Sequence, residues 1–269
     1  MRSSILKSLK PDIMVEMLEN AFLSENWDRI LNTSDILFSY AQCIYEERQD
    51  LKSKGLPLSL GVVMPHSLVY YFGFSHLMRG IAHQKQGHYN QARECMSKYA
   101  DLGWLDGLDE EGLQLVEEFR FLAKTNLYTL DILVGKTDQL EEYVVFLQDY
   151  PEELLPGLDS ILQAVFRHVM NVYELLRTFA QQFTEFGESR EEANPSYYYN
   201  YCYYLAVYHK RAGRHSEALE CILQCIILAH KSHNDGDFRN CMALFESLRD
   251  RATEEQIRQY QEVLTAVLE

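Results

Sequence analysis

Two segments of the chain, GIAHQKQGHYNQA at residues 80–92 and AVYHKRAGRHSEA at residues 206–218, have the same spacing of small residues. The shared positions are Gly80, Gly87 and Ala92 in the first segment and Ala206, Gly213 and Ala218 in the second. A glycine that ends a helix takes a left-handed backbone conformation that other residues resist. Small side chains before and after it allow two helices to approach closely. Each segment therefore predicts a helical hairpin that turns at its glycine.

Helical periodicity extends over most of the chain, and no stretch shows the strict alternation of a half-buried strand. Glycine (13) and proline (6) together make up 19 of 269 residues, which is well below the usual share and favours few, long elements. The expected helices begin near Pro11 and continue at about 28–52, 66–85, 89–102, 110–134, 138–149, 159–186, 196–212, 216–232, 237–250 and 254–268. Breaks are expected at 55–65, 151–157 and 187–195. The predicted fold is all-α.

Helices that come in pairs with short glycine turns indicate a repeat array. The 80–92 segment has the spacing of the first-helix glycine, turn glycine, aromatic and small residue of a tetratricopeptide repeat, and weaker copies begin at Gly135 and Gly236. This resemblance implies a degenerate tetratricopeptide-like solenoid of helical hairpins, wound as a right-handed superhelix, over residues 11–269. Residues 1–10 form an N-terminal segment or linker in this interpretation. An unrelated helical bundle is the alternative.

The chain is acidic, with 25 basic and 40 acidic side chains and a net charge of −15. Because an acidic chain repels phosphate, we expect no direct nucleic-acid binding by this chain. No apolar run reaches the length of a membrane span, and the N-terminus does not open a signal-peptide core. These features predict a cytoplasmic protein without membrane contact. They also predict reduced, buried cysteines at Cys43, Cys95, Cys202, Cys221, Cys225 and Cys241.

Motifs that carry catalytic or metal chemistry are weak in this sequence. The segment 134–137 lacks the first glycine of a phosphate-binding loop, and the Asp-Gly segments at 106–109 and 235–237 lack the ligand spacing of a calcium loop. Cys221 and Cys225 stand one helical turn apart, which suits metal ligation, but their apolar neighbours favour core thiols. No catalytic nucleophile motif or dinucleotide loop is present. We therefore expect no enzymatic activity, no cofactor and no metal site.

An asparagine stands inside several of the predicted helices, four or five residues before a leucine. Asparagine is a poor mid-helix residue because its side chain competes for backbone hydrogen bonds. Its amide both donates and accepts, which suits it to hold an extended peptide, and a nearby tyrosine offers a rigid amphipathic contact. The candidate peptide-binding residues are Asn126, Tyr128, Asn171, Tyr173, Asn200, Tyr204 and Asn240. The alternative is that each asparagine hydrogen-bonds a neighbouring helix or caps a local bend.

From about residue 11 to the end, a degenerate tetratricopeptide array with in-helix asparagines resembles the ligand-binding region of the RRNPP-type quorum-sensing receptors of Gram-positive bacteria. The resemblance implies a cytosolic receptor that binds a short signalling peptide in its concave groove, possesses no enzymatic activity and often forms a dimer. It also implies transcription regulation, with a DNA-binding domain that residues 1–10 cannot contain. The alternative function is a protein-binding tetratricopeptide-like scaffold or adaptor with no peptide ligand.

Overall fold

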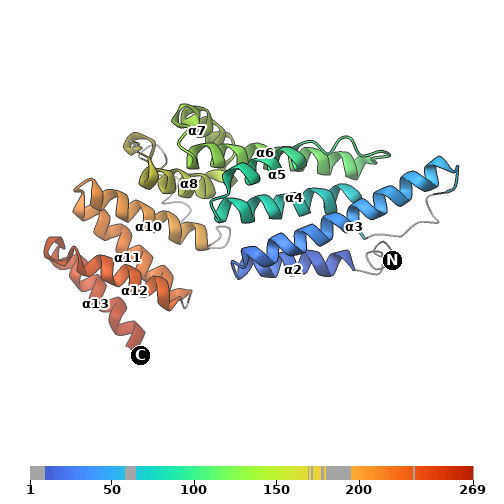
Figure 1. Cartoon of the computed structure of the whole chain (residues 1–269). Coiled ribbons are helices and arrows are strands. Elements are labelled where there is room, and N and C mark those ends of the chain that lie inside the picture. Colours follow the sequence, from blue (N-terminus) through green and yellow to red (C-terminus); the bar gives the residue numbers. More distant parts are fainter. Residues whose placement is uncertain are drawn as a thin grey trace. The chain divides into compact units, whose positions relative to one another are not determined.

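The computed structural model describes residues 10–57, 65–168, 170, 172–176, 179, 195–232 and 234–268. Every regular element in these ranges is a helix, which confirms the predicted all-α fold (Figure 1). The chain divides into two compact units, Met1–Leu130 and Asp131–Glu269, and each is described by itself. The single repeat domain predicted for residues 11–269 stays a prediction.

The first unit consists of helices that pack on their neighbours in chain order. These helices are α2 (Pro11–Leu23), α3 (Trp27–Ser53), α4 (Leu68–Lys85), α5 (Tyr89–Ala100) and the part of α6 (Glu110–Leu133) up to Leu130. Helix α2 packs on α3, α3 on α4, and α4 on α5. Pro11 occupies the first turn of α2, as predicted, where its missing N–H costs nothing. The largest buried side chains between these helices are aromatic, among them Tyr40, Tyr71 and Phe72.

The hairpin of α4 and α5 has the close approach that its small residues predict. A Cβ atom added at Gly80 would lie 3.2 Å from the Cβ of Cys95 on α5, so a larger residue would push the helices apart. Gly87 forms the turn with a φ of +76°, in the left-handed region. A Cβ atom at Gly73 would overlap the ring of Phe119 on α6. The predicted turn at Gly87 is therefore confirmed, and α4 is held close to two neighbours.

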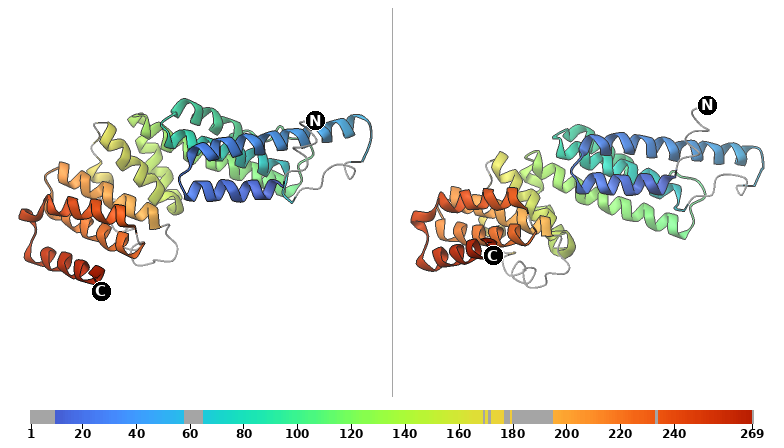
Figure 2. Two further views of the ribbon diagram at one scale, coloured as in Figure 1. Left: turned by 60° about the horizontal axis from the view of Figure 1, so that its bottom comes forward. Right: turned by 90° about the horizontal axis from the view of Figure 1, so that it is seen from below.

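The second unit continues the same order of packing. Its helices are α7 (Leu140–Asp149), α8 (Leu154–Arg167), α10 (Pro195–Arg211), α11 (His215–Lys231), α12 (Asp235–Glu246) and α13 (Glu254–Leu268), with short 3-10 turns η2 (Thr137–Gln139), η3 (Pro151–Glu153) and η4 (Arg249–Arg251). Helix α7 packs on α8, α8 on α10 and α10 on α11, and α11 also contacts α12 and α13 (Figure 2). Gly213 turns between α10 and α11 with a φ of +74°, which confirms the second predicted hairpin.

Two predicted boundaries around α8 are wrong. The expected break at 151–157 contains helix, because Pro156 falls in the first turn of α8, where a proline removes no intrahelical hydrogen bond. The expected helix at 159–186 is interrupted, because α8 ends at Arg167, although the described residues 173–176 and 179 are helical again. His168 takes an extended backbone (φ −127°, ψ 150°), and its Nε2 lies 3.1 Å from the carbonyl oxygen of Leu133. The helix thus ends next to a residue whose imidazole ring contacts another segment of the same unit.

All six cysteines are free, and Cys95, Cys202, Cys225 and Cys241 are buried, whereas Cys43 and Cys221 are partly exposed. The prediction of buried thiols is thus confirmed for four of the six positions. Within the ranges that the structure describes, no helix has both the length and the apolar character needed to cross a membrane.

A substitution at Gly87 tests the hairpin turn. Nothing lies within 4 Å of a Cβ added there, so the cost of Gly87→Ala comes from the backbone alone, and we expect a loss of about 1 kcal/mol in the free energy of unfolding. The control is Gly103→Ala, which meets equally open space at a glycine without a positive φ. Urea titration followed by circular dichroism measures both. Equal stability of the two variants would contradict the account of the turn.

Protonation of His76 should couple stability to pH. The side chain is 6% exposed, packs on Phe38, and has no hydrogen-bond partner for Nδ1. Burial, with a smaller contribution from Lys98, lowers the pKa of His76 from 6.5 to about 4. At a pH between these two pKa values, His76 is protonated in the unfolded chain but neutral in the folded chain. The free energy of unfolding therefore falls as the pH falls. We expect this histidine to account for a loss of about 2 kcal/mol between pH 7.5 and pH 5.

The measurement is urea unfolding at both pH values for the wild type and for His76→Leu. The variant should lose about 2 kcal/mol less than the wild type over this interval, because it has no imidazole to protonate. If His76→Leu and the wild type lose the same stability, the buried imidazole is not the titrating group.

Candidate functional site

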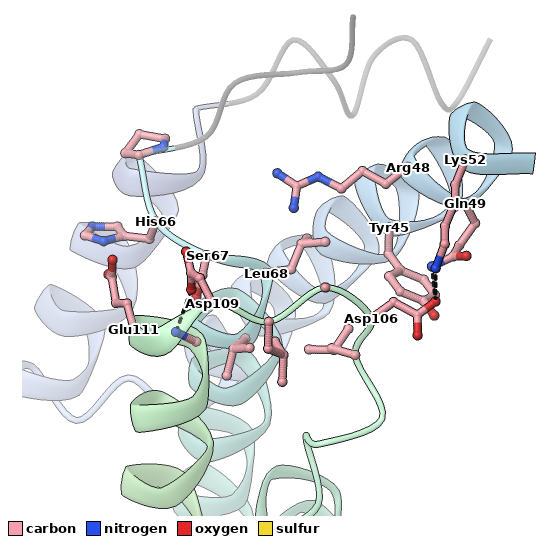
Figure 3. Close-up of a pocket in the computed structure, with 16 residues that line it drawn as sticks. Tyr45, Arg48, Gln49, Lys52, His66, Ser67, Leu68, Asp106, Asp109 and Glu111 are labelled. Carbon is pink, nitrogen blue, oxygen red and sulfur yellow. Dashed lines mark hydrogen bonds and ion pairs between the residues drawn. The ribbon is translucent and has the colours of Figure 1, made fainter. Parts of the chain in front are cut away.

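A pocket of about 510 Å³ opens in the first unit between the C-terminal half of α3, the start of α4 and the residues that lead into α6 (Figure 3). We call it the charged pocket. Its polar lining residues are Arg48, Gln49, Lys52, His66, Ser67, Asp106, Asp109 and Glu111. Its apolar lining includes Tyr45, Leu68, Val69, Leu105 and Leu108.

The local structure fixes the walls of the charged pocket. Arg48 and Lys52 stand four residues apart on α3 and therefore on one face of that helix. The hydroxyl of Ser67 caps α4 by accepting from the backbone N–H of Tyr70 at 3.4 Å. The carboxylate of Asp109 accepts from the N–H of Gly112 at 2.8 Å, in the first turn of α6. Two capped helix starts and one long helix thus hold the pocket open.

Apart from Asp106, which pairs with Lys52, the two signs of charge occupy different parts of the charged pocket. Arg48 and Lys52 come from α3, whereas Asp109 and Glu111 lie where α6 begins, close to His66 in the view of Figure 3. A ligand that carries both an anionic and a cationic group fits this separation. The apolar residues between the two parts offer a surface for a side chain, as in most small-molecule and peptide pockets.

The basic wall contains one cation in an ion pair, Lys52, and one, Arg48, that forms none with the residues the structure describes. Lys52 Nζ lies 3.1 Å from Asp106 Oδ2, and Gln49 Nε2 donates to the same oxygen at 3.3 Å. These hydrogen bonds, the one from Lys52 first, hold the pKa of Asp106 below its usual value. The guanidinium of Arg48 extends over the pocket (Figure 3) and forms no ion pair with any residue that the structure describes. Arg48 is therefore the cation that remains for a ligand.

Comparison of the chain with protein-family models, with curated proteins and with solved structures finds no match. The charged pocket is for that reason interpreted through its own side chains. Among the described residues, no group of three or more His, Cys, Asp or Glu side chains is arranged to hold a metal ion.

A second pocket, of about 870 Å³, lies in the second unit on α10, α11 and α13. We call it the amide pocket. It is lined by three glutamines (Gln224, Gln256 and Gln259), two tyrosines (Tyr198 and Tyr201), the thiols of Cys202 and Cys221, and Leu205, Ser216, Glu220, Leu223, Thr253 and Glu255. Gln256 is buried and already engaged, because its amide donates to the carbonyl oxygen of Ser216 and accepts from the N–H of Thr253. Amide and tyrosine side chains, the combination that we predicted for a peptide site, thus occur together in this pocket, but the amides belong to glutamines and not to asparagines.

The predicted residues of the first unit, Asn126 and Tyr128, line neither pocket. Asn126 donates from its amide to the hydroxyl of Tyr99 at 2.9 Å, which joins α6 to α5. Tyr128 is 8% exposed, and Lys124 Nζ lies 5.7 Å from the centre of its ring. For Asn126 the structure therefore supplies the bond to a neighbouring helix that the alternative interpretation named.

Of the predicted residues of the second unit that the structure describes, none lines the amide pocket. Tyr173 is 40% exposed and packs under the guanidinium of Arg214 at 4.5 Å. Tyr204 lies 5.5 Å from Phe166, ring centre to ring centre. The remaining positions are Asn200, which is half-buried, Asn240, which is exposed, and Asn171, which lies outside the described residues. Their role in peptide binding stays a prediction.

Sequence reasoning did not identify Arg48, Asp109 and Glu111 as site residues. The only local signal was the pair of cations one helical turn apart on α3. Acidic residues at a helix start, such as the run at 109–111, are equally well explained by the helix dipole. The pocket depends on bringing α3 and the start of α6 together, and no local pattern encodes that contact.

The bond between Asn126 and Tyr99 can be tested by a double-mutant cycle. The Tyr99 side chain is 1% exposed, so Asn126→Ala leaves a buried hydroxyl without a partner and should cost about 1–3 kcal/mol of unfolding free energy. In a Tyr99→Phe background the same change should cost clearly less, because the hydroxyl is gone. Urea unfolding of the four proteins measures the coupling. Additive costs would show that the bond contributes nothing.

Proposed function

We propose that this chain is a receptor for a short peptide and that the charged pocket receives the free carboxylate of that peptide. The observation that carries the proposal is the guanidinium of Arg48, which extends over the pocket without an ion-pair partner among the described residues. A guanidinium offers two parallel N–H donors that match the two oxygens of a carboxylate. Lys52 adds positive charge one helical turn away.

The rest of the charged pocket matches the other parts of a peptide. Asp109 and Glu111 provide acceptors for an ammonium group or a basic side chain, at the part of the pocket away from Arg48 (Figure 3). Leu68 and Leu105 offer apolar contact for a side chain. The volume of about 510 Å³ lies within the usual range for ligand pockets and suits the end of a peptide rather than a folded domain.

The order of packing supports a tetratricopeptide-like solenoid as the architecture of this receptor. Two hairpins turn at left-handed glycines, Gly87 and Gly213, and helices α2 to α5 and α7 to α12 that the structure describes pack in chain order within their units, whereas α13 packs on α11. Repeat arrays of this kind present extended binding surfaces. In our proposal the array is a degenerate, right-handed one that acts as the peptide-sensing region of a cytoplasmic transcription regulator and dimerises. A protein-binding scaffold or adaptor remains the alternative.

Binding to synthetic peptides tests the proposal. The purified full chain is used to select from a random pool of seven-residue peptides with free carboxylates, and a selected peptide is titrated by calorimetry. Arg48→Gln should weaken binding by about 10- to 150-fold, the cost of losing a hydrogen bond between charged groups. Arg29→Gln is the matched control, because it removes the same charge from an exposed position of α3 outside the pocket.

Amidation of the peptide should produce a similar loss in the wild type and little further loss in Arg48→Gln, since both changes break the same contact. If no peptide is selected, or if amidation has no effect on affinity, the proposal is wrong. Capture of a folded domain with equal affinity by the wild type and Arg48→Gln would favour the scaffold.

A further inference from the structure

The amide pocket of the second unit is formed by parts of three helices. Its lining residues fall within 198–205 of α10, 216–224 of α11 and 253–259 at the start of α13. Its volume of about 870 Å³ lies within the usual range for pockets that bind small molecules. The pocket is therefore large enough for a small organic molecule, and its side chains decide which kind it accepts.

A buried amide holds two walls of the amide pocket together. Gln256 is 5% exposed, and its Nε2 donates to the carbonyl oxygen of Ser216 at the start of α11 at 3.3 Å. Its Oε1 accepts from the backbone N–H of Thr253 at 3.1 Å, and the backbone N–H of Gln256 donates to Thr253 Oγ1 at 3.2 Å. This reciprocal pair is a capping box at the start of α13. Gln256 thus fixes α13 against α11, and both ends of its amide are engaged.

The charge that lines the amide pocket is negative. Its charged side chains are Glu220 and Glu255, and no lysine or arginine is found among the described residues that line it. Burial raises the pKa of Tyr198 to about 12 and also raises the pKa of Cys221, so this phenol and this thiol stay neutral at pH 7. The pocket therefore attracts cations and repels anions. The net charge of −15 on the whole chain acts in the same direction.

Of the two carboxylates, Glu220 is the one available to a ligand. Glu255 accepts from Arg258 Nη2 at 2.7 Å and from Gln259 Nε2 at 3.2 Å, both on its own helix. Glu220 is exposed, and its side chain forms no ion pair or hydrogen bond with any residue that the structure describes. Gln224 is exposed one helical turn further along α11, and its amide also makes no hydrogen bond within the described ranges. One face of α11 thus offers two neighbouring acceptors.

Helix α10 adds apolar and aromatic surface to the amide pocket. It contributes Leu205 and the rings of Tyr198 and Tyr201. Methylene groups gain free energy when such a surface removes them from water, and the face of a tyrosine ring attracts a cation. Among the described residues, no three His, Cys, Asp or Glu side chains are arranged to hold a metal ion. The lining therefore matches a cation that carries an alkyl chain.

We propose that the amide pocket binds a primary alkylammonium group, carried by a free alkylamine or by a lysine side chain. An ammonium group has three N–H donors and no acceptor, so it matches the carboxylate of Glu220 and the amide oxygen of Gln224. The alkyl chain contacts Leu205 and the tyrosine rings of α10. The site belongs to the second unit and is independent of the function proposed for the charged pocket.

Calorimetric titration of the full chain with n-pentylamine tests this proposal, in an amine-free buffer at pH 7, where the amine is protonated. We expect saturable binding of one amine per chain. The alcohol 1-pentanol has the same alkyl chain without the charge and should bind about fivefold more weakly or worse. Glu220→Lys replaces attraction by repulsion and should weaken amine binding by about tenfold or more. Glu141→Lys, which makes the same charge change at an exposed position of α7 outside the pocket, should bind like the wild type.

A lysine blocked at both ends, Nα-acetyl-lysine N-methylamide, distinguishes the two sources of the ammonium group. Tighter binding than that of n-pentylamine assigns the site to a lysine side chain, and weaker binding assigns it to a free amine. The proposal is overturned if neither amine saturates the wild type, if 1-pentanol binds as tightly as the amine, or if Glu220→Lys and Glu141→Lys weaken binding equally. The first two of these results need no variant that folds. Arg48→Gln should bind the amine like the wild type, which separates this result from that for the charged pocket.

Discussion

The arrangement of the first unit depends on how closely α4 approaches its neighbours. Gly80 leaves only 3.2 Å between an added Cβ and the side chain of α5, and Gly73 leaves no room for one beside the ring of Phe119 on α6. These contacts fix α4 between α5 and α6, because packed interiors do not absorb an extra methyl group without a shift. Helix α4 begins at the charged pocket with Ser67 and Leu68. Its position therefore sets the distance between the basic wall on α3 and the acidic wall on α6.

Local sequence patterns were enough to predict most of the helices and the two main turns. A left-handed glycine is a property of a few adjacent residues, so Gly87 and Gly213 could be placed from the chain alone. The end of α8 could not be placed in this way, because the residue that follows it, His168, contacts a carbonyl oxygen 35 positions away in the chain. The prediction of a break at 151–157 was wrong for a local reason. Pro156 was interpreted as a turn former, although a first helical turn accepts proline.

The candidate site was much harder to predict than the fold. The charged pocket combines three stretches, at 45–52, 65–69 and 105–112, none of which is unusual by itself. The asparagine pattern was visible in the sequence, but the role of Asn126 depends on Tyr99, which belongs to another helix. An amide inside a helix indicates that some polar partner exists. Only the packing of helices decides whether that partner is a ligand or the protein itself.

The arrangement of charges also restricts which ligand the charged pocket would accept. Lys52 and Asp106 form an ion pair whose side chains are 64% and 53% exposed, so the pair adds little stability, and Gln49 donates a hydrogen bond to the same carboxylate. Its effect is to occupy this carboxylate, which leaves Arg48 available to an incoming anion. The chain as a whole carries a charge of −15 and repels anions at long range, whereas salt screens such forces beyond about 8 Å. A peptide with basic side chains would approach readily and then place its single carboxylate at Arg48, while a small free anion would gain the same contact without the attraction. The proposed site therefore favours a basic peptide with a free C-terminus over simple carboxylates.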